Sequence, residues 1–542
     1  MDERGHDSGR NPGAGGCEEI DERTPQDYCG MDEGPYTARV TNPLTPPTPR
    51  LISIDRQQIL LRTVDVEKLI DEDHSARSVW ELVGRLDLGL YHAQIEAVEG
   101  CAGRNHTDPQ LLVSLWLYAY SRGISSAREV ARQCEFEPGF QWLCGLQAIS
   151  HRTLSGFRSG NKAALDDLFV QVLGMLSAEG LITLERVTLD GTKIKANAGG
   201  NSFRRKEKLE AHLELAREQV RILNAEGEEK ETTANRQAAA RRRAARQRAS
   251  RLEAAVREVE RLQQEKKHDR KDFVARASST DPDAHVMRNG EGGTVPSYNV
   301  QLLTDVTHGL VVNVDATTDA IDYRQLQPAL ERCETTLGQK PKQIVADGDY
   351  TNHASVQAAA TCGVDFYGSW QDSWKPTEHD AQGRSAEFLA SAFPYDATRD
   401  CFTCPARKIL THHALLNRGN GVHTHVYRAP KAACPNCPLR GQCAPPDARP
   451  AWRRSITRLE EPATTTVFKA KMATEEARQI YAKRSQIAEF PHAWIKERCC
   501  LRQFRCRNRL KVAMEATWAC LSYNLTRWFS IRRNLNLGTA SA

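Results

Sequence analysis

Apolar residues recur at helical spacing over residues 51–181, which predicts a helical first domain. In TDPQLLVSLWLYAYSRG, Thr107 or Asp108 is placed to cap a helix whose first position is Pro109. A break is expected at Pro138, and a further helix should begin near Ser150. Short amphipathic helices in this order suit a helix-turn-helix-like bundle that binds DNA. An ordinary helical domain with solvated arginines is the alternative.

The hydrophobic period changes near Leu184 to the alternation that is typical of strands. LERVTLDGTKIKA predicts a strand that ends at Asp190, a turn at Gly191, and a second strand over Thr192–Ala196. PSYNVQLLTD and the following LVVNVD predict a hairpin that turns at His308 and Gly309.

Further along, helical and strand patterns alternate. A helix is expected over Arg324–Cys333, and KQIVADGDY then predicts a strand that ends in Asp347. A second helix should begin near Asn352, and VDFYGSW predicts another strand after it. Strands that alternate with helices indicate a layered α/β domain.

Four other segments differ in composition from these regular patterns. The first is rich in Gly, Pro and acidic residues and is expected to be a disordered tail. The segment at 201–275 predicts two charged helices that reverse near Gly227. The segment at 375–465 is expected to be loop-like and Cys-rich, and the segment at 466–535 is expected to be helical. The predicted organisation is a tail at 1–50, a helical DNA-binding domain at 51–181, an α/β core from 182 to 374 with an inserted hairpin at 201–275, a Cys-rich insertion at 375–465, and C-terminal core helices at 466–535.

Composition narrows the class of protein. Of 542 residues, 40% are hydrophobic and 26% are charged, which is typical of a globular protein. We expect no membrane span, because no apolar run approaches the required length, and the first residues lack the apolar core of a signal peptide. A cytoplasmic protein with reduced thiols is therefore expected, even with 16 cysteines.

Two aspartates are the first candidates for chemistry, because each follows an apolar strand and precedes glycine. Asp190 and Asp347 would emerge at one edge of the sheet, where open α/β sheets bind ligands. Paired carboxylates repel unless a divalent cation lies between them, and such sites suit Mg²⁺ or Mn²⁺ and phosphate substrates. Either Asp-Gly pair alone is also a common turn.

A second group of candidates lies near the C-terminus. Tyr481 and Arg484 are three residues apart and would be neighbours on one helix face, where both could bind a phosphate. Glu489 and Lys496 would share a face if the helix were continuous, but Pro491 predicts a break or a kink near Phe490. An ordinary exposed charged helix is the alternative.

The order of these features resembles the DDE transposases of bacterial insertion sequences, which have a ribonuclease-H-like catalytic core and a Tyr-Arg-Glu-Lys signature. The resemblance spans about residues 51 to 530, and the fold class it implies is α/β. It implies a mixed-sheet ribonuclease-H-like core with a helical N-terminal domain, a helical-hairpin insertion and a Cys-rich insertion. The matching stretches are VTLDGTKIKANAG, TDPDAHVMRNG, PSYNVQLLTD, VADGDY, CPNCPLRGQC and YAKRSQIAEFPHAWIK.

The resemblance implies that Asp190, Asp347 and Glu489 hold two Mg²⁺ or Mn²⁺ ions at the scissile phosphate. Tyr481, Arg484 and Lys496 fall on the signature's other positions, which contact DNA phosphates. The implied partners are the element's double-stranded terminal repeats and a target DNA, bound by a homodimer. The implied reaction is cleavage at the element ends followed by attack of the 3′-hydroxyls on the target.

Cysteine spacing suggests a second metal. Cys401 and Cys404 form one C-x-x-C pair, and Cys434 and Cys437 form another, with Cys443 as a competing ligand. In a reduced protein this pattern predicts a structural zinc ion. Thiols that merely pack in a loop-rich insertion are the alternative.

A basic stretch follows the glutamate helix. It runs from Lys496 to Lys511 and includes Arg502 and Arg505, with Phe504 among the cations. This pattern suits a groove lined by DNA phosphates, although a solvated surface would look similar. The favoured function is therefore a transposase. The alternatives are a nuclease of the same fold that lacks strand transfer, and a catalytically inactive DNA-binding protein.

Overall fold

The computed structural model describes residues 56–540 apart from short gaps at 58, 60, 62, 97–104, 229–234, 267–272, 291, 371–385, 420 and 446. All the helices and strands described below belong to one compact unit, Val64–Ala542. The predicted tail at 1–50 lies outside the described residues.

Helices make up the first part of the described chain, as the apolar pattern predicted. Asp108 caps α3 by accepting a hydrogen bond from the Gln110 amide at 2.8 Å, and Pro109 is its first residue. α5 begins at Pro138, and Ser150 caps α6, so both predicted boundaries are confirmed. The elements are η1 (Val66–Leu69), α1 (Ser75–Val83), α2 (Gly89–His92), α3 (Pro109–Ser121), α4 (Ala127–Phe136), α5 (Pro138–Cys144), α6 (His151–Arg158) and α7 (Lys162–Ala178).

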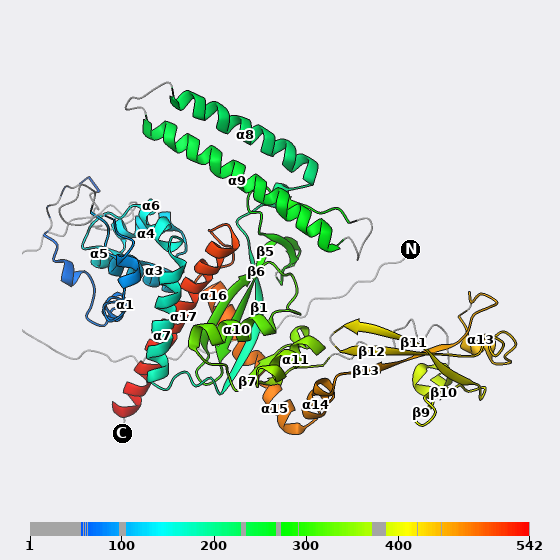
Figure 1. The fold of residues 1–542 in the computed structure, drawn as a ribbon. Coiled ribbons are helices and arrows are strands. Elements are labelled where there is room, and N and C mark those ends of the chain that lie inside the picture. Colours follow the sequence, from blue (N-terminus) through cyan, green and yellow to red (C-terminus); the bar gives the residue numbers. More distant parts are fainter. Residues whose placement is uncertain are drawn as a thin grey trace, which may run out of the picture. The chain divides into compact units, whose positions relative to one another are not determined.

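A mixed sheet forms the centre of the α/β part (Figure 1). Its strands are β1 (Arg186–Lys195), β4 (His285–Arg288), β5 (Thr294–Asp305), β6 (Leu310–Thr317), β7 (Gln343–Ala346) and β8 (Asp365–Tyr367). The order is β4-β5-β1-β7-β8, and β6 also pairs with β5. β5 is antiparallel to both of its long neighbours, β1 and β6, whereas β7 runs parallel to β1 and β8 runs parallel to β7. The predicted hairpin is confirmed, with Gly309 at φ 66° in its turn.

β1 does not turn at Gly191, so the prediction of two short strands was wrong. Gly191 is paired with Gln301 in the middle of a continuous ladder between β1 and β5. A side chain at this position would meet Gln301 Nε2 at 2.5 Å and Asp322 Oδ1 at 2.6 Å. The glycine is therefore explained by a close approach of neighbouring side chains, and Asp190 lies inside a strand and not at its end.

Helices pack on the sheet and connect it to the first domain. α10 (Leu326–Leu337) packs on β6, and α11 (His353–Thr361) packs on β8. The long α17 (Arg509–Ala540) contacts β6, α3 and α7. The core position predicted for this last helix is confirmed, although residues 512–525 are buried on every side and not on one side alone. The five residues predicted to face the core are all buried: Val512, Trp518, Leu521, Leu525 and Trp528. One apolar core therefore includes the first helices, the sheet and α17.

Two long helices, α8 (Lys206–Glu228) and α9 (Asn235–Lys266), pack side by side (Figure 1). Their own small apolar cluster includes Leu209, Leu213, Leu252 and Val259. The segment that joins them lies outside the described residues. At the base of the helix pair, η2 (Gly200–Ser202) leads into β2 (Phe203–Arg204), which pairs with β3 (Ala277–Ser278).

The Cys-rich segment was expected to be loop-like, and this expectation was wrong. It contains an antiparallel sheet in the order β13-β12-β11-β10-β9 with a separate apolar cluster. Its strands carry many His, Thr and Arg residues, so their alternation gives little apolar contrast. The elements are η4 (Ala386–Phe388), η5 (Ala390–Ala392), β9 (Tyr395–Asp396), β10 (Cys401–Thr403), β11 (Ile409–Gly419), β12 (Val422–Arg428), α13 (Arg440–Cys443) and β13 (Ser455–Glu460).

The signature segment forms two helices that follow α14 (Ala463–Met472). α15 (Glu475–Ala482) ends before Lys483, and α16 (Arg484–Glu497) begins directly after it. Tyr481 and Arg484 are therefore on different helices, which corrects the prediction of one shared face. α16 continues through Pro491, so the predicted break is also wrong. Pro491 is buried, and packing of this helix against β1 outweighs the loss of one backbone hydrogen bond. No helix in the described ranges has both the length and the apolarity to cross a bilayer.

Candidate active site

Asp190 and Asp347 lie side by side on neighbouring parallel strands. β1 and β7 pair in register up to Leu189 and Ala346, and the two aspartates are the next residues on each strand. Asp190 continues along β1, whereas Asp347 caps the short 3-10 helix η3 (Gly348–Tyr350). Its Oδ1 accepts a hydrogen bond from the Asp349 amide at 2.6 Å.

The first residue of α16 contacts both aspartates. Arg484 Nη1 lies 4.0 Å from Asp190 Oδ1, and Nη2 lies 3.8 Å from Asp347 Oδ2. The guanidinium is mostly buried, with 15% of its side chain exposed. Two adjacent carboxylates repel, so a cation between them stabilises the pair.

The environment of Asp190 opposes its negative charge. Burial raises the pKa of Asp190 to about 6, and the charges of Asp347 and Asp322 also raise it. The nearby Arg484 charge and the Gly191 amide, which donates a hydrogen bond to Oδ1, lower this pKa and only partly offset the burial. A raised carboxyl pKa beside a second carboxylate is a feature of sites that bind cations or protons.

His492 was not selected from the sequence, yet it reaches Asp190 from α16. Its Nε2 lies 3.7 Å from Asp190 Oδ2, and 8% of its side chain is exposed. Burial, together with the charge of Lys496, lowers the pKa of His492 to about 3. The imidazole is therefore neutral at pH 7, and the contact is not an ion pair.

A polar network lies beside Asp190 on the sheet. Asp322 Oδ1 accepts hydrogen bonds from Gln301 Nε2 at 2.6 Å and from Asn299 Nδ2 at 2.7 Å. The buried Tyr350 hydroxyl donates to Gln301 Oε1 at 2.5 Å. Sequence reasoning missed this network. A polar Asn-x-Gln pair inside an otherwise apolar strand was the available signal, since buried polar side chains need partners.

Glu489 shares α16 with Arg484 and His492, but its side chain is exposed. The face of α16 toward the aspartates carries Arg484, Ala488 and His492, which are four residues apart. Within the described chain, no hydrogen bond or ion pair joins Glu489 to either aspartate. The structure thus brings together two of the three predicted carboxylates.

The remaining predicted DNA contacts lie on α15, α16 and the loop that follows. Tyr481 is half-buried against β7 and β8, with the Arg484 guanidinium carbon 6.0 Å from its ring centroid. Lys496 lies in the last turn of α16. Arg502 is exposed and pairs with Glu497, and the Arg505 side chain is also exposed.

The loop that carries these arginines is fixed to the end of β1. The Lys195 amide donates to the Arg502 carbonyl at 3.3 Å, and the Phe504 amide donates to the Lys195 carbonyl at 2.9 Å. Phe504 is buried, and α17 supplies Glu515 as the acceptor for the Arg505 amide. β1 therefore runs from Asp190 directly to this basic loop.

Metal ligands were predicted at two places. Over the described ranges, no group of three or more His, Cys, Asp or Glu side chains is arranged to hold a metal ion. Cys401 lies in β10 and is buried, whereas Cys404, Cys434 and Cys437 line a cavity together with Cys443. The four cysteines predicted as zinc ligands therefore do not share one cavity.

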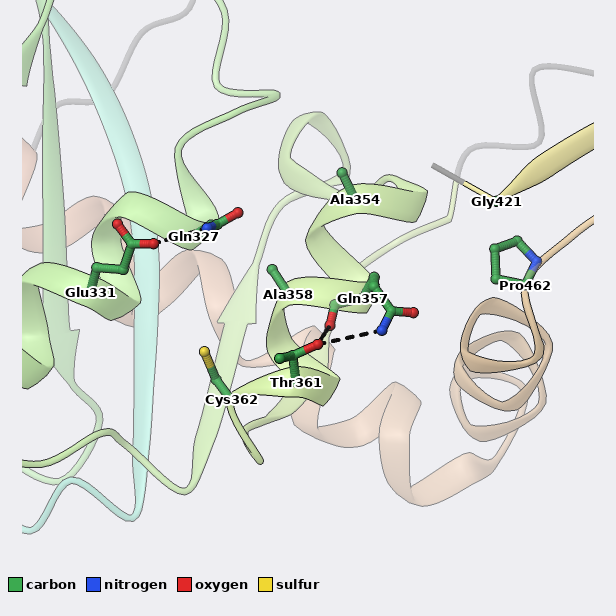
Figure 2. Close-up of a pocket in the computed structure, with 9 residues that line it drawn as sticks. All are labelled: Gln327, Glu331, Ala354, Gln357, Ala358, Thr361, Cys362, Gly421 and Pro462. Carbon is green, nitrogen blue, oxygen red and sulfur yellow. Dashed lines mark hydrogen bonds between the residues drawn. The ribbon is translucent and has the colours of Figure 1, made fainter. Parts of the chain in front are cut away.

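A larger pocket of about 550 Å³ lies between α10, α11 and the Cys-rich insertion (Figure 2). Gln327 and Glu331 line it from α10, and Gly421 and Pro462 line it from the insertion. Figure 2 also shows the hydrogen bonds between Gln357 and Thr361 on α11. None of the predicted site residues lines this pocket, so it gives no support to the predicted chemistry.

Two segments of the chain match family models of transposases. Residues 403–529 match the family model described as Transposase DDE domain, and residues 64–160 match the model described as Transposase domain (DUF772). The first match includes Glu489 and Lys496 but neither aspartate. Together the two matches support a DDE transposase of an insertion-sequence family, which confirms the resemblance predicted from the sequence.

Comparison with curated proteins gave no match. Among solved structures, the chain is similar to the piggyBac transposase in a synaptic complex with hairpin DNA, at 7% identity and a TM-score of 0.30. The similarity covers 83% of this chain and 75% of that chain. At this score the likeness adds nothing to the assignment.

Proposed function

We propose that this transposase cleaves DNA at the ends of an insertion sequence and joins the freed 3′-hydroxyls to target DNA. The observation that carries the proposal is the placement of Asp190 and Asp347 on adjacent parallel strands, with Arg484 in contact with both. Paired carboxylates suit phosphoryl transfer, in which the protein mainly positions reactants and offsets charge.

The proposed cofactors are two Mg²⁺ or Mn²⁺ ions held by Asp190, Asp347 and Glu489. The residues fit such ions, because both aspartates offer hard oxygen ligands and already attract a cation in the form of Arg484. When bound, the ions would lower the pKa of the attacking hydroxyl and stabilise the leaving oxygen. Glu489 is included among the proposed metal ligands because it falls on the glutamate position of the family signature.

The surrounding side chains are proposed to position these groups. Neutral His492 lies beside Asp190 without adding charge, and Asp322 is fixed by the amides of Asn299 and Gln301. Arg484 contacts the carboxylates here, and we propose that it binds a DNA phosphate once metal ions offset the aspartates.

The proposed fold of the core is ribonuclease-H-like. Its support is the order of strands across the sheet, β6-β5-β1-β7-β8. In this order β5 is antiparallel to β6 and to β1, whereas β7 and β8 run parallel to β1. We retain the domain boundaries at 51–181, 182–374 with 201–275 inserted, 375–465 and 466–535 as part of this proposal. The first of these is proposed to bind DNA.

The proposed partners are double-stranded terminal repeats and a target DNA, held by a homodimer in the bacterial cytoplasm. Tyr481, Lys496, Arg502 and Arg505 are the proposed phosphate contacts in addition to Arg484. The exposed arginines of the loop after α16 lie along the continuation of β1 beyond Asp190, which supports a DNA path past the aspartates.

The test uses the purified full chain and a labelled duplex containing the inverted repeats that flank its coding region. With Mg²⁺ present, we expect D190N and D347N to reduce cleavage at least ~100-fold while duplex binding stays within about threefold. D349N is the matched control, because Asp349 contributes its backbone amide and not its carboxylate to the site.

Cleavage by D190N at the rate of the wild-type protein would contradict the proposal. The alternative functions are separated by supplying pre-cleaved 3′-hydroxyl ends with a target plasmid. Joined products are expected from a transposase and not from a nuclease, while DNA binding without Mg²⁺-dependent cutting would indicate an inactive protein.

A further inference from the structure

Four cysteines of the insertion line one small cavity. Cys404 follows β10, Cys434 and Cys437 lie in the loop between β12 and β13, and Cys443 ends α13. The cavity volume is about 30 Å³, which is room for a guest no larger than a water molecule or an ion. Segments distant in the sequence thus contribute cysteines to the lining of a single small cavity.

Backbone amides already point at two of these sulfurs. The Lys408 amide donates to Cys404 Sγ at 3.3 Å, and the Arg454 amide donates to Cys434 Sγ at 3.4 Å. The first contact closes a tight turn in which Arg407 has φ 56° and its amide donates to the Cys404 carbonyl at 2.8 Å. Amides aimed at sulfur stabilise a thiolate and fix the direction in which it can bind a metal.

Positive charge is also present at this cavity. Arg440 and Arg454 line it along with the cysteines. The Arg440 guanidinium is held by the carbonyls of Arg449, Cys434 and Trp452 at 2.9–3.4 Å. A zinc ion with four thiolates carries a net charge of −2, so two guanidinium groups would offset it.

Cys401, although part of a C-x-x-C pair, is in a different place. It pairs with Thr411 and Asp396 inside the sheet and does not line the cavity. No histidine is among the described residues that line the cavity, and His425 contacts His412 and Glu460. Cys443 takes the place that spacing alone had given to Cys401.

We propose that Cys404, Cys434, Cys437 and Cys443 bind one structural Zn²⁺ ion. In the described structure the cysteines line the cavity without being arranged as a ligand group, so binding requires the four sulfur atoms to converge on the ion. Four thiol protons leave as the four sulfur–zinc bonds form. The ion would tie the turn after β10 to the loop between β12 and β13.

The test is the metal content of the full chain purified without added chelator. We expect about one zinc per chain in the wild type and in C401S, and less than about a quarter in C437S and C443S. C401S is the matched control, since it removes a cysteine of the same motif that lies outside the cavity. Circular dichroism establishes whether each variant is folded.

A second measurement does not depend on the variants folding. Co²⁺ added to the wild-type protein after zinc removal should give the visible absorption of a tetrahedral site and a thiolate charge-transfer band. Zinc below about half an ion per chain, together with no cobalt spectrum, would overturn the proposal. Loss of zinc from C401S with retention in C443S would overturn the choice of ligands.

Discussion

At the scale of single residues, the surroundings of Asp190 determine how it ionises. It lies within a strand, beside a glycine that has no room for a side chain, and its neighbours include two other acids. Burial is the largest cause of its raised pKa, and Arg484 only partly opposes it. This carboxylate therefore gains from any cation that binds beside it.

The pKa of about 6 predicts a pH dependence of both stability and cleavage. Because the folded-state pKa lies above the unfolded value of about 3.8, the ionised carboxylate destabilises the fold above pH 6. Without metal, D190N should therefore melt a few degrees higher than the wild type at pH 8, and this difference should shrink as pH falls from 6 toward 4.

Mg²⁺-dependent cleavage by the wild type should fall as pH drops through 6, because the proton and the metal compete for Asp190.

His492 opposes the stability trend of Asp190, since a neutral buried imidazole makes the fold less stable as pH falls below 6.5. Other charged groups at the site are Arg484, Lys496 and Asp347. Melting scans of wild type, D190N and H492Q separate the two contributions, and equal melting of wild type and D190N at pH 8 would contradict the assignment.

At the scale of elements, a buried acid of α17 holds the basic loop in place. Glu515 is fully buried and accepts hydrogen bonds from the Arg505 and Cys506 amides at 2.8–3.1 Å. It also lies 3.6 Å from the buried Arg158 of α6. One carboxylate thus fixes the loop beyond β1 and offsets a cation of α6.

E515A should reduce the free energy of unfolding by about 3–5 kcal/mol, because it leaves the buried Arg158 without its ion-pair partner and two loop amides without their acceptor. Urea denaturation followed by fluorescence measures this change. The control is E497Q, which removes only an exposed pair with Arg502 and should cost less than about 1 kcal/mol. Equal losses of unfolding free energy in the two variants would show that the buried contact stabilises the fold no more than the exposed pair does.

At the scale of the whole molecule, α17 joins the first helices and the sheet in one apolar core, whereas the Cys-rich sheet has its own cluster. Trp518 is fully buried and donates its indole N–H to the Arg158 carbonyl at 3.1 Å. The apolar contacts of this helix are shared between two regions far apart in sequence.

W518A should therefore destabilise α3 and β6 together, by about 3–5 kcal/mol, and leave the β9–β13 sheet unchanged. Hydrogen–deuterium exchange measures protection in each segment. The matched variant is Y427A in the separate cluster, which should increase exchange in β9–β13 only. Increased exchange confined to α17 in W518A would contradict a shared core.

The sequence by itself determined the features that depend on local patterns. Helix starts at Pro109, Pro138 and after Ser150, the hairpin at Gly309, and the core position of α17 all follow from capping, turn chemistry and periodicity. The ordered motifs also indicated the family. Each of these signals lies within a short stretch of chain.

Only the tertiary structure decided which residues meet. The continuous β1, the helix that passes Pro491, and the presence of Cys443 instead of Cys401 in the lining of one cavity all depend on contacts between distant segments. Pairing with β5 keeps Gly191 extended, and packing on β1 keeps Pro491 helical. Local preferences of about 1–3 kcal/mol are smaller than the summed burial and hydrogen bonding of such contacts, so tertiary contacts override them.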